Sequence, residues 1–318
     1  MLLRISALVL FAAAAACTPA SSRPEPAAAL QRPQETIRLW PGAPPGEAVE
    51  TGPEVIGSEG SATGAYSRIS VPRMDVYRPD RPNRTAVLVL GGGGYFRIQV
   101  GSAAAPIARW LQSEGTTAFV LYYRLPGDGW PAVAPMQDAQ RALRTIRAQA
   151  AGYGIDPAKI GVIGSSAGGH LAGMMATRGD HSFYGPVDAI DRIRATPDFA
   201  GLLYPVISLR SPIDTTRTRR ELGSQADAVA AYSVETLVTA ATPPVFLAHT
   251  ADDPIADVRH SQWMFDAMRR ANRPVEMHIF ERGGHSWGMG EPGSAVSAWP
   301  RLFRQWARSH GFMSRPER

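Results

Sequence analysis

The chain has 318 residues, of which 44% are hydrophobic and 19% charged, and this composition is typical of a globular protein with enough apolar material for a core. The net charge of +5 comes almost entirely from arginine, because Lys159 is the only lysine. The arginines are scattered, and the group Arg217, Arg219 and Arg220 lacks the aromatic interleaving of a nucleic-acid surface. These features exclude a collagen-like, coiled-coil or disordered chain and do not indicate a nucleic-acid partner.

The first residues have the pattern of an export signal. Arg4 precedes an apolar run over 5–16, which is too short to span a bilayer because that takes about 20 residues. The run ends in A-A-A-C at Cys17, the only cysteine. This resembles a bacterial lipobox, although Ala14 stands where leucine is usual. We therefore expect a lipoprotein-type signal peptide over 1–17, with plain secretory cleavage as the alternative, and a periplasmic or outer-membrane location.

The remaining chain divides into a tether and one domain. Residues 18–34 are rich in Ala, Pro and Ser without apolar periodicity, and we expect a flexible tether there. Over 35–318, short β-rich runs alternate with helix-length amphipathic stretches. This alternation favours a single α/β domain with a mostly parallel sheet covered by helices on both faces.

The predicted elements follow one another at short intervals. Early strand structure is expected over 67–77, either as a strand or as a hairpin interrupted at Pro72. The later predicted strands cover 85–90, 117–123, 159–164, 198–204, 244–249 and 275–280. The predicted helices cover 106–113, 135–150, 167–177, 258–271 and 299–308. The run over 85–90 is apolar throughout, as in a central strand buried on both faces. The stretch 205–242 has mixed polarity and is expected to be an insertion over the site.

The strongest chemical signal is G-S-S-A-G at 164–168. It matches the nucleophile motif G-x-S-x-G, and it lies between an apolar strand and a helix, as that motif requires. Small neighbours allow a strained turn that exposes the Ser166 hydroxyl at a helix N-terminus, which favours developing negative charge. A glycine-rich helix start without catalysis is the alternative, and the strand and helix around the motif argue against it.

A serine nucleophile needs a general base, and the base needs a third group to orient it. In hydrolases with this turn the chain order is Ser, acid, His. His285 lies in G-G-H-S-W, directly after the last predicted strand, and is therefore the predicted base. His249 and His278 lie inside predicted strands, where a structural role is expected.

The predicted acid lies in A-D-D-P, after the strand over 244–249. Asp252 and Asp253 are both candidates, and because adjacent side chains diverge, only one is expected to reach the imidazole. Pro254 favours an extended conformation for the residue before it, so Asp253 is preferred. Asp252 is expected to fix the turn through its own backbone.

Backbone donors for the oxyanion are expected at two places. The Ala167 N–H follows the nucleophile, and Gly93 and Gly94 follow the strand over 85–90. The glycine run lacks the continuation of a phosphate loop or a dinucleotide motif. No set of His, Cys or acidic residues has metal-ligand spacing, so neither a metal nor another cofactor is expected.

Four aromatic residues lie beside these motifs. Tyr95, Trp130, Tyr204 and Trp287 are expected to form the wall of an acyl or sugar site, with simple packing as the alternative.

Motifs along most of the chain resemble those of the carbohydrate-acting esterases of the α/β-hydrolase fold, which include acetylxylan esterases, feruloyl esterases and xylanase-B-like esterases. The resemblance is carried by L-W-P-G-A-P-P-G (39–46), V-Y-R-P-D (76–80), G-G-G-Y (92–95), Y-R-L-P (123–126), Q-D-A-Q-R-A-L-R (137–144), G-S-S-A-G-G-H-L-A (164–172), Y-P-V-I-S (204–208), P-P-V-F-L-A-H-T-A-D-D-P (243–254) and G-G-H-S-W-G (283–288). One departure is Gly91, where relatives usually have proline or histidine.

The resemblance implies Ser166, Asp253 and His285 as a catalytic triad, with the Gly93–Gly94 loop and Ala167 as the oxyanion hole. It also implies hydrolysis of short acyl esters, acetate foremost, on plant-type polysaccharides or oligosaccharides. Two alternatives remain open, a serine peptidase of the prolyl-oligopeptidase type and a non-catalytic binding protein on the same fold.

Overall fold

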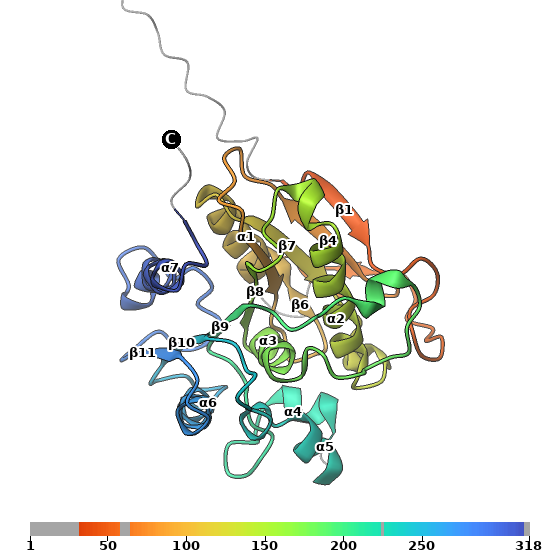
Figure 1. Cartoon of the computed structure of the whole chain (residues 1–318). Helices are drawn as coiled ribbons and strands as arrows, with labels where there is room; N and C mark the ends of the chain where they lie inside the picture. The colour runs from red at the N-terminus through yellow and green to blue at the C-terminus, as the bar shows by residue number, and fades with distance from the viewer. Residues whose placement is uncertain (1–31, 58–63, 224–225, 315–318) are drawn as a thin grey trace, which may run out of the picture.

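An eight-stranded sheet forms the centre of the fold in a computed structural model that describes residues 32–57, 64–223 and 226–314 (Figure 1). In spatial order the strands are β1 (Glu35–Arg38), β4 (Arg73–Tyr77), β7 (Thr117–Tyr122), β5 (Ala86–Leu90), β8 (Ile160–Ser165), β9 (Phe199–Leu203), β10 (Val245–Thr250) and β11 (Val275–Phe280). β1 and β4 pair antiparallel with their neighbours, and all pairs from β7 to β11 are parallel. The predicted mostly parallel sheet is confirmed.

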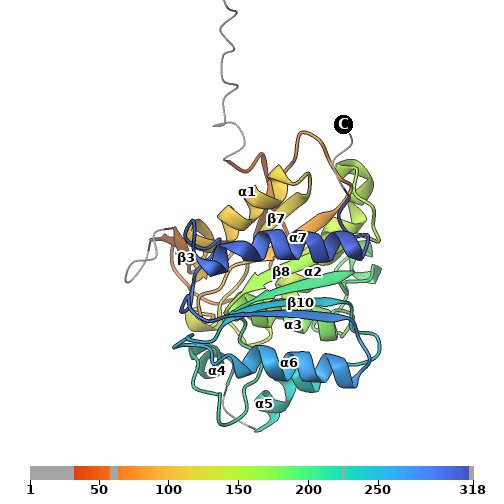
Figure 2. The ribbon, with the colours of Figure 1, turned by 90° about the vertical axis from the view of Figure 1, so that its left-hand side faces the viewer.

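Helices cover both faces of this sheet (Figure 2). One face is covered by α1 (Ala105–Ser113) and α7 (Trp299–Ser309), and the other by α2 (Ala134–Ala148), α3 (Ala167–Arg178) and α6 (Arg259–Arg270). Coverage on both sides explains why every residue of β5 and β8 is buried. It also explains the spacing in α7, whose buried residues include Trp299, Phe303 and Trp306 on one side of the helix.

The predicted interruption of the strand region over 67–77 is present, but the strands on its two sides do not pair as a hairpin. β3 (Ala65–Ser67) joins a small second sheet with β2 (Val55–Ile56) and β6 (Ile98–Gln99), whereas β4 begins only at Arg73 in the main sheet. Arg68 has a left-handed backbone with φ 57°, which turns the chain, and Pro72 has no N–H to donate. Both features prevent a continuous strand.

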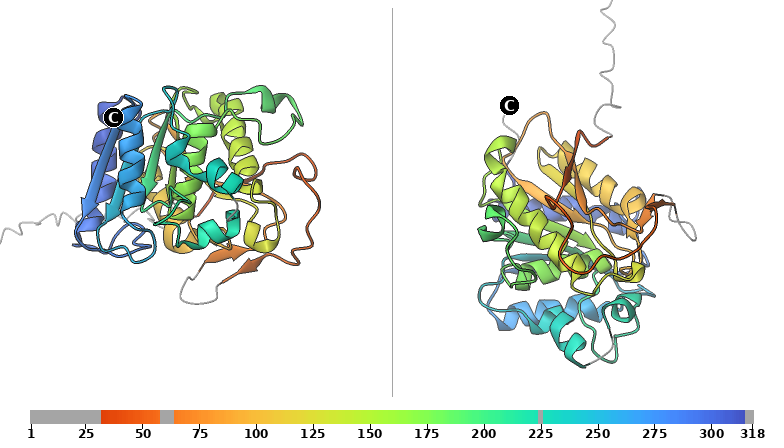
Figure 3. Two further views of the ribbon diagram at one scale, coloured as in Figure 1. Left: turned by 90° about the horizontal axis from the view of Figure 1, so that it is seen from below. Right: turned by 90° about the vertical axis from the view of Figure 1, so that its right-hand side faces the viewer.

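The insertion over 205–242 contains short helices. They are α4 (Arg217–Leu222), α5 (Ala226–Tyr232) and the 3-10 turn η6 (Val234–Thr236). Figures 2 and 3 show α4 and α5 on the same side of the main sheet as α6, and in Figure 2 α4 lies toward the left-hand end of the sheet, where the parallel strands finish. The other short turns are η2 (Val100–Ala104), η3 (Pro126–Asp128), η4 (Ala150–Tyr153), η5 (Ala189–Arg192) and η7 (Ala295–Ala298).

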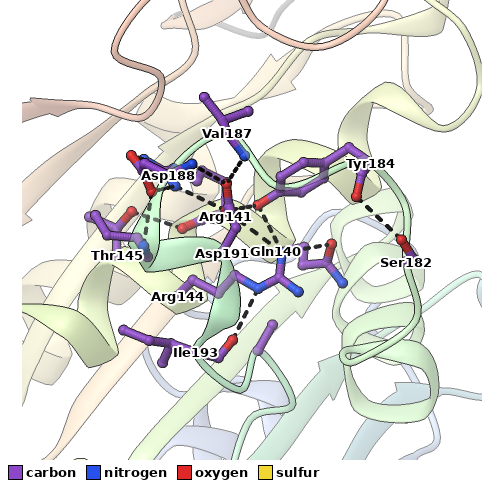
Figure 4. A network of polar contacts seen from close by, with 12 residues as sticks. Gln140, Arg141, Arg144, Thr145, Ser182, Tyr184, Val187, Asp188, Asp191 and Ile193 are labelled. Atoms are coloured by element: carbon purple, nitrogen blue, oxygen red, sulfur yellow. Dashed lines mark hydrogen bonds and ion pairs between the residues drawn. The ribbon is translucent and has the colours of Figure 1, made fainter.

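Ion pairs of the buried Arg141 join α2 to its surroundings. Arg141 donates to Asp188 at 2.7 and 2.6 Å and to Asp191 at 2.9 Å (Figure 4). Tyr184 and Val187 also donate to Asp191. The Q-D-A-Q-R-A-L-R motif therefore fixes the segment after α3 against α2.

A second buried pair lies at the start of the same helix. Arg124 and Asp138 are fully buried and their side chains are bonded at 2.9 Å. Trp40 Nε1 donates to the same carboxylate, and another Arg124 nitrogen donates to the Pro45 carbonyl at 2.7 Å. These contacts attach the N-terminal loop to α2.

Two sequence predictions concern the N-terminal segment. The predicted signal peptide, 1–17, and the predicted tether up to residue 31 lie outside the described residues. Within the part of the chain that the structure describes, no helix is long and apolar enough to cross a bilayer.

Candidate active site

The loops that carry the predicted catalytic residues follow the carboxyl ends of the parallel strands, at the left-hand end of the sheet in Figure 2. The turn after β8 holds Ser166, the loop after β10 holds Asp253, and the loop after β11 holds His285. Strands that run parallel finish at one edge, so residues far apart in the chain meet there.

Ser166 lies at a sharp turn between β8 and α3. Its backbone has φ 53° and ψ −120°, a conformation that costs free energy in a non-glycine residue and occurs at functional turns. The close approach of strand and helix requires glycine nearby, since a Cβ at Gly164 would lie 2.0 Å from the Gly168 carbonyl oxygen. The predicted strained turn is present.

Three side chains form a continuous hydrogen-bonded series. His285 Nε2 lies 2.8 Å from Ser166 Oγ, and His285 Nδ1 lies 2.6 Å from Asp253 Oδ2. A carboxylate only accepts, so Nδ1 carries the proton and Nε2 is free to accept from the serine hydroxyl. The structure therefore brings together the three residues that the sequence selected, in an arrangement that can remove a proton from Ser166.

The Asp253 carboxylate is an anion stabilised inside the protein. Its side chain has no exposed surface, and Oδ1 accepts from the Ile255 and Ala256 N–H groups at 2.8 and 2.9 Å. Burial alone would raise the pKa of Asp253, but hydrogen bonds from His249 and His285 outweigh it and hold that pKa well below its usual range. Asp253 is consequently ionised over the whole pH range in which the site could act.

Asp252 reaches the loop of the predicted base rather than the imidazole. Its carboxylate accepts from the Gly284 N–H at 2.8 Å and from the Gly283 N–H at 3.3 Å. The two adjacent acids therefore have different partners. One binds the His285 ring and the other binds the backbone just before it.

The expected oxyanion donors belong to two segments that meet at the nucleophile. Ala167 is the first residue of α3, and the glycine loop passes so close that a Cβ at Gly92 would lie 2.9 Å from Ser166 Cβ. Gly93 has φ 131° and Gly94 has φ 63°, and the Gly93 carbonyl accepts from the Phe96 and Arg97 N–H groups. The loop is thus held in a conformation that residues with side chains rarely adopt.

Gly91 departs from the pattern of the related esterases, and the packing around it explains why. A Cβ there would lie 2.8 Å from the Ile98 side chain and 3.0 Å from the Gln99 carbonyl oxygen. The Tyr123 hydroxyl also donates to the Gly91 carbonyl at 2.7 Å. In this chain β6 occupies the space that a larger residue would need.

The four predicted aromatic residues have different positions. The Tyr204 ring contacts the His285 ring edge-on at 4.9 Å, and the Trp287 ring packs on Tyr204 at 4.4 Å. Tyr95 is not a wall residue, because it is fully buried and its hydroxyl is bonded to His170. Trp130 lines a cavity of about 400 Å³ with Trp40, and neither Ser166 nor His285 is among the lining residues of that cavity.

Sequence reasoning missed how buried histidines support these loops. His249 lies against Asp253, although its position in a strand pattern predicted only a structural role. The signal was its distance of four residues from the predicted acid. Within the described residues, no three His, Cys, Asp or Glu side chains are placed so that they could bind a metal ion.

Residues 74–268 match the BD-FAE family. The chain belongs to this family. Among proteins similar to it, the acetylxylan esterase of Xylanibacter ruminicola is 27% identical over 69% of this chain and 44% of the relative. The endo-1,4-beta-xylanase B of Butyrivibrio fibrisolvens is 32% identical over 68% of this chain and 34% of the relative. The chain therefore spans less than half the length of these two relatives.

A solved structure covers nearly the whole of this BD-FAE member. The acetyl ester-xyloside bifunctional hydrolase of Caldicellulosiruptor lactoaceticus has a TM-score of 0.75 and 31% identity, over 90% of this chain and 99% of that one. The similarity agrees with the sheet order and confirms the α/β-hydrolase fold. It also confirms the resemblance to carbohydrate esterases that the motifs predicted.

Proposed function

We propose that this BD-FAE member is a serine esterase that hydrolyses short-chain acyl esters, acetate foremost, on plant-type polysaccharides or their oligosaccharides. The observation that supports it most is the hydrogen-bonded series from Ser166 through His285 to Asp253. This arrangement fits acyl transfer, because Asp253 orients the His285 ring and His285 can accept the proton of the Ser166 hydroxyl.

In the proposed mechanism, Ser166 Oγ attacks the ester carbonyl while His285 Nε2 takes the hydroxyl proton. The oxyanion accepts hydrogen bonds from the N–H of Ala167 and from N–H groups of Gly93 and Gly94. His285 then gives the proton to the leaving sugar oxygen, and the acyl group stays on Ser166. A water molecule, deprotonated by His285, attacks this acyl-enzyme and releases the carboxylic acid.

Asp253 stays ionised throughout the proposed cycle. It holds the Nδ1–H tautomer and stabilises the imidazolium that forms in each step. Its low pKa, the result of hydrogen bonds that outweigh burial, is consistent with this role. Proton transfer therefore stops at His285.

The substrate class rests on the family and on the names of the relatives. One relative is an acetylxylan esterase, and the solved structure described above is an acetyl ester-xyloside bifunctional hydrolase. Tyr204 is buried against the imidazole, and Trp287, which is half-buried, packs on Tyr204 and offers apolar surface to an acyl group or sugar ring.

We also propose that residues 35–318 form the catalytic domain and that the protein is exported as a lipoprotein anchored through Cys17. Export would place the enzyme where polysaccharide fragments are present. Labelling of cells with a radioactive fatty acid, compared between the natural chain and Cys17→Ala, tests the anchor. Equal labelling of the two proteins would contradict it.

Hydrolysis of an aryl acetate by the natural enzyme and by Ser166→Ala tests the assignment. Loss of the nucleophile should reduce kcat by about four to six orders of magnitude. Ser165→Ala is the matched control, because Ser165 is the neighbouring serine of the same motif and should keep kcat within about tenfold of the natural enzyme. Equal rates for the natural enzyme and Ser166→Ala would refute the assignment.

The substrate is tested by comparing acetylated xylan, feruloylated oligosaccharides, simple acyl esters and a proline-containing peptide. We expect the highest kcat/KM on acetylated oligosaccharides. Preferential cleavage of the peptide would favour the peptidase alternative. A fluorophosphonate probe that fails to label Ser166 would favour the non-catalytic alternative.

A further inference from the structure

We propose that His249 is a positioning residue of this site, whose Nε2–H is a second donor to the Asp253 oxygen that binds His285. The proposed esterase mechanism uses only one histidine, and the inference rests on that mechanism. In the structure the acid lies between two imidazoles rather than at the end of a series.

The contacts of His249 are short and fully buried. The residue lies next to the end of β10 and has no exposed surface. Its Nε2 lies 3.2 Å from Asp253 Oδ2 and 2.9 Å from the Ala256 carbonyl oxygen, and its Nδ1 lies 2.8 Å from Ser261 Oγ. Both ring nitrogens are therefore engaged.

These partners determine where the imidazole proton lies. A carbonyl oxygen can only accept, so Nε2 carries a proton, and in the neutral ring Nδ1 accepts from the Ser261 hydroxyl. The Nε2–H is shared between Ala256 O and Asp253 Oδ2. Ser261 belongs to α6, so a helix fixes the ring while the ring fixes the acid loop.

The Asp253 carboxylate consequently has four donors. Two backbone N–H groups bind Oδ1, and the two imidazole N–H groups of His249 and His285 bind Oδ2. Each donor favours the anion and disperses its charge. With His249 removed, Oδ2 would attract the charged form of His285 more strongly, and the carboxylate would lose one of the contacts that fix its orientation.

The groups around His249 do not replace this contribution. On α6, His260 is buried and its pKa is lowered by burial to about 3, so it is neutral. Asp257 is paired with Arg259 at 2.7 Å. On β11 the register partner of His249 is the apolar Ile279, and on α3 the buried His170 has its pKa lowered by burial to about 4.

Three variants separate positioning from simple packing. His249→Leu removes both nitrogens, and His249→Gln keeps an N–H donor near the Nε2 position. Ser261→Ala is the matched control, because it removes a partner of the His249 ring and leaves the Nε2–H in place. A thermal melt of each variant first establishes that the protein is folded.

We expect His249→Leu to lower kcat by about tenfold with KM nearly unchanged, the factor that one hydrogen bond to a charged group contributes. The acid limb of kcat/KM should move to higher pH, because the charged form of His285 persists longer. His249→Gln should restore both toward the natural values, and Ser261→Ala should change kcat by less than about threefold.

A measurement without substrate separates this inference from the esterase proposal. Titration of the His285 ring by nuclear magnetic resonance should show a higher midpoint in His249→Leu than in the natural protein, and a restored one in His249→Gln. Unchanged titration in a folded His249→Leu variant would overturn the inference. If the titration shifts but no ester is cleaved by the natural protein, the esterase proposal fails and the positioning contact stands.

Discussion

Two buried polar regions of the molecule are built from different chemistry. Around α2, Arg124 pairs with Asp138, and Arg141 pairs with Asp188 and Asp191, so full charges face full charges. Behind the candidate active site three buried imidazoles, His170, His249 and His260, contact the loops instead, and burial lowers the pKa of His170 and His260 so that these two are neutral. The first region fixes helices and loops through ion pairs, and the second does so through hydrogen bonds of imidazole rings.

Each buried histidine in the second region holds a different active-site loop. His170 bonds to the Tyr95 hydroxyl at 2.9 Å and to the Tyr232 carbonyl at 2.7 Å, which links the glycine loop to the insertion. His260 Nδ1 accepts from the Ile207 and Ser208 N–H groups at 3.1 Å. His249, described above, holds the acid loop.

The difference has a consequence for the chemistry of the site. A buried charge near the triad would shift the balance between neutral and charged His285, because charges interact strongly where water is excluded. Neutral imidazoles fix the loops without adding a charge, and His249 acts on that balance only through its hydrogen bond to Asp253. The ion pairs lie around α2, where no proton is transferred in the proposed mechanism.

The largest effect is expected from breaking the charged region. Asp138→Asn would leave Arg124 buried without its counter-charge, and we expect the free energy of unfolding to fall by about 3–5 kcal/mol. Urea unfolding at pH 7 measures it. The matched control is Asp257→Asn, which weakens the exposed pair with Arg259 and should cost less than about 1 kcal/mol. Similar losses of unfolding free energy in the two variants would contradict the expected difference between a buried and an exposed ion pair.

The neutral region should respond to acid. Burial lowers the pKa of His170 from 6.5 to about 4 and that of His260 to about 3. Between pH 6.5 and pH 4 the unfolded chain therefore binds protons that the folded chain does not. Stability is complete above pH 6.5 and falls with decreasing pH, by about 1.4 kcal/mol per pH unit for each histidine.

Urea unfolding at pH 7, 6 and 5 tests this dependence. His170→Gln keeps one donor and one acceptor but cannot be protonated, so the slope of unfolding free energy against pH should decrease by about 1.4 kcal/mol per unit. A slope equal to that of the natural protein would show that His170 is not the group that titrates.

Much of this arrangement follows from local sequence patterns. The apolar strands, the helix after Ser166 and the position of His285 were predicted because each depends on a short run of residues with clear periodicity or a known motif. The paired acids were also found, since Pro254 distinguishes Asp253 from its neighbour. These features need no knowledge of distant contacts.

The features that sequence reasoning missed depend on long-range packing. β3 and β6 form a sheet of very short strands whose partners are more than thirty residues apart in the chain, so no local pattern marks them. Tyr95 looked like a wall residue because it follows the glycine loop, but its hydroxyl is satisfied by His170 inside the protein. Because this partner is 75 residues away in the chain, the local sequence does not indicate that the Tyr95 hydroxyl is buried.

The smallest effect is expected from removing one hydroxyl, that of Tyr95, which is bonded to the buried His170. The His170 Nε2–H donates to a carbonyl, so Nδ1 accepts from Tyr95, and Tyr95→Phe leaves that buried acceptor without a donor. We expect a loss of about 1–2 kcal/mol in unfolding free energy and a lower kcat on the aryl acetate, because the glycine loop loses its attachment to α3.

Tyr123→Phe is the matched control, since it removes a hydroxyl that donates to the same loop at Gly91 without involving a histidine. Both variants should be destabilised, but only Tyr95→Phe should change how stability depends on pH between 6.5 and 4, because only there does His170 lose a partner that favours its neutral form. The same pH dependence in both variants would show that the histidine contact does not distinguish this region from ordinary buried hydrogen bonds.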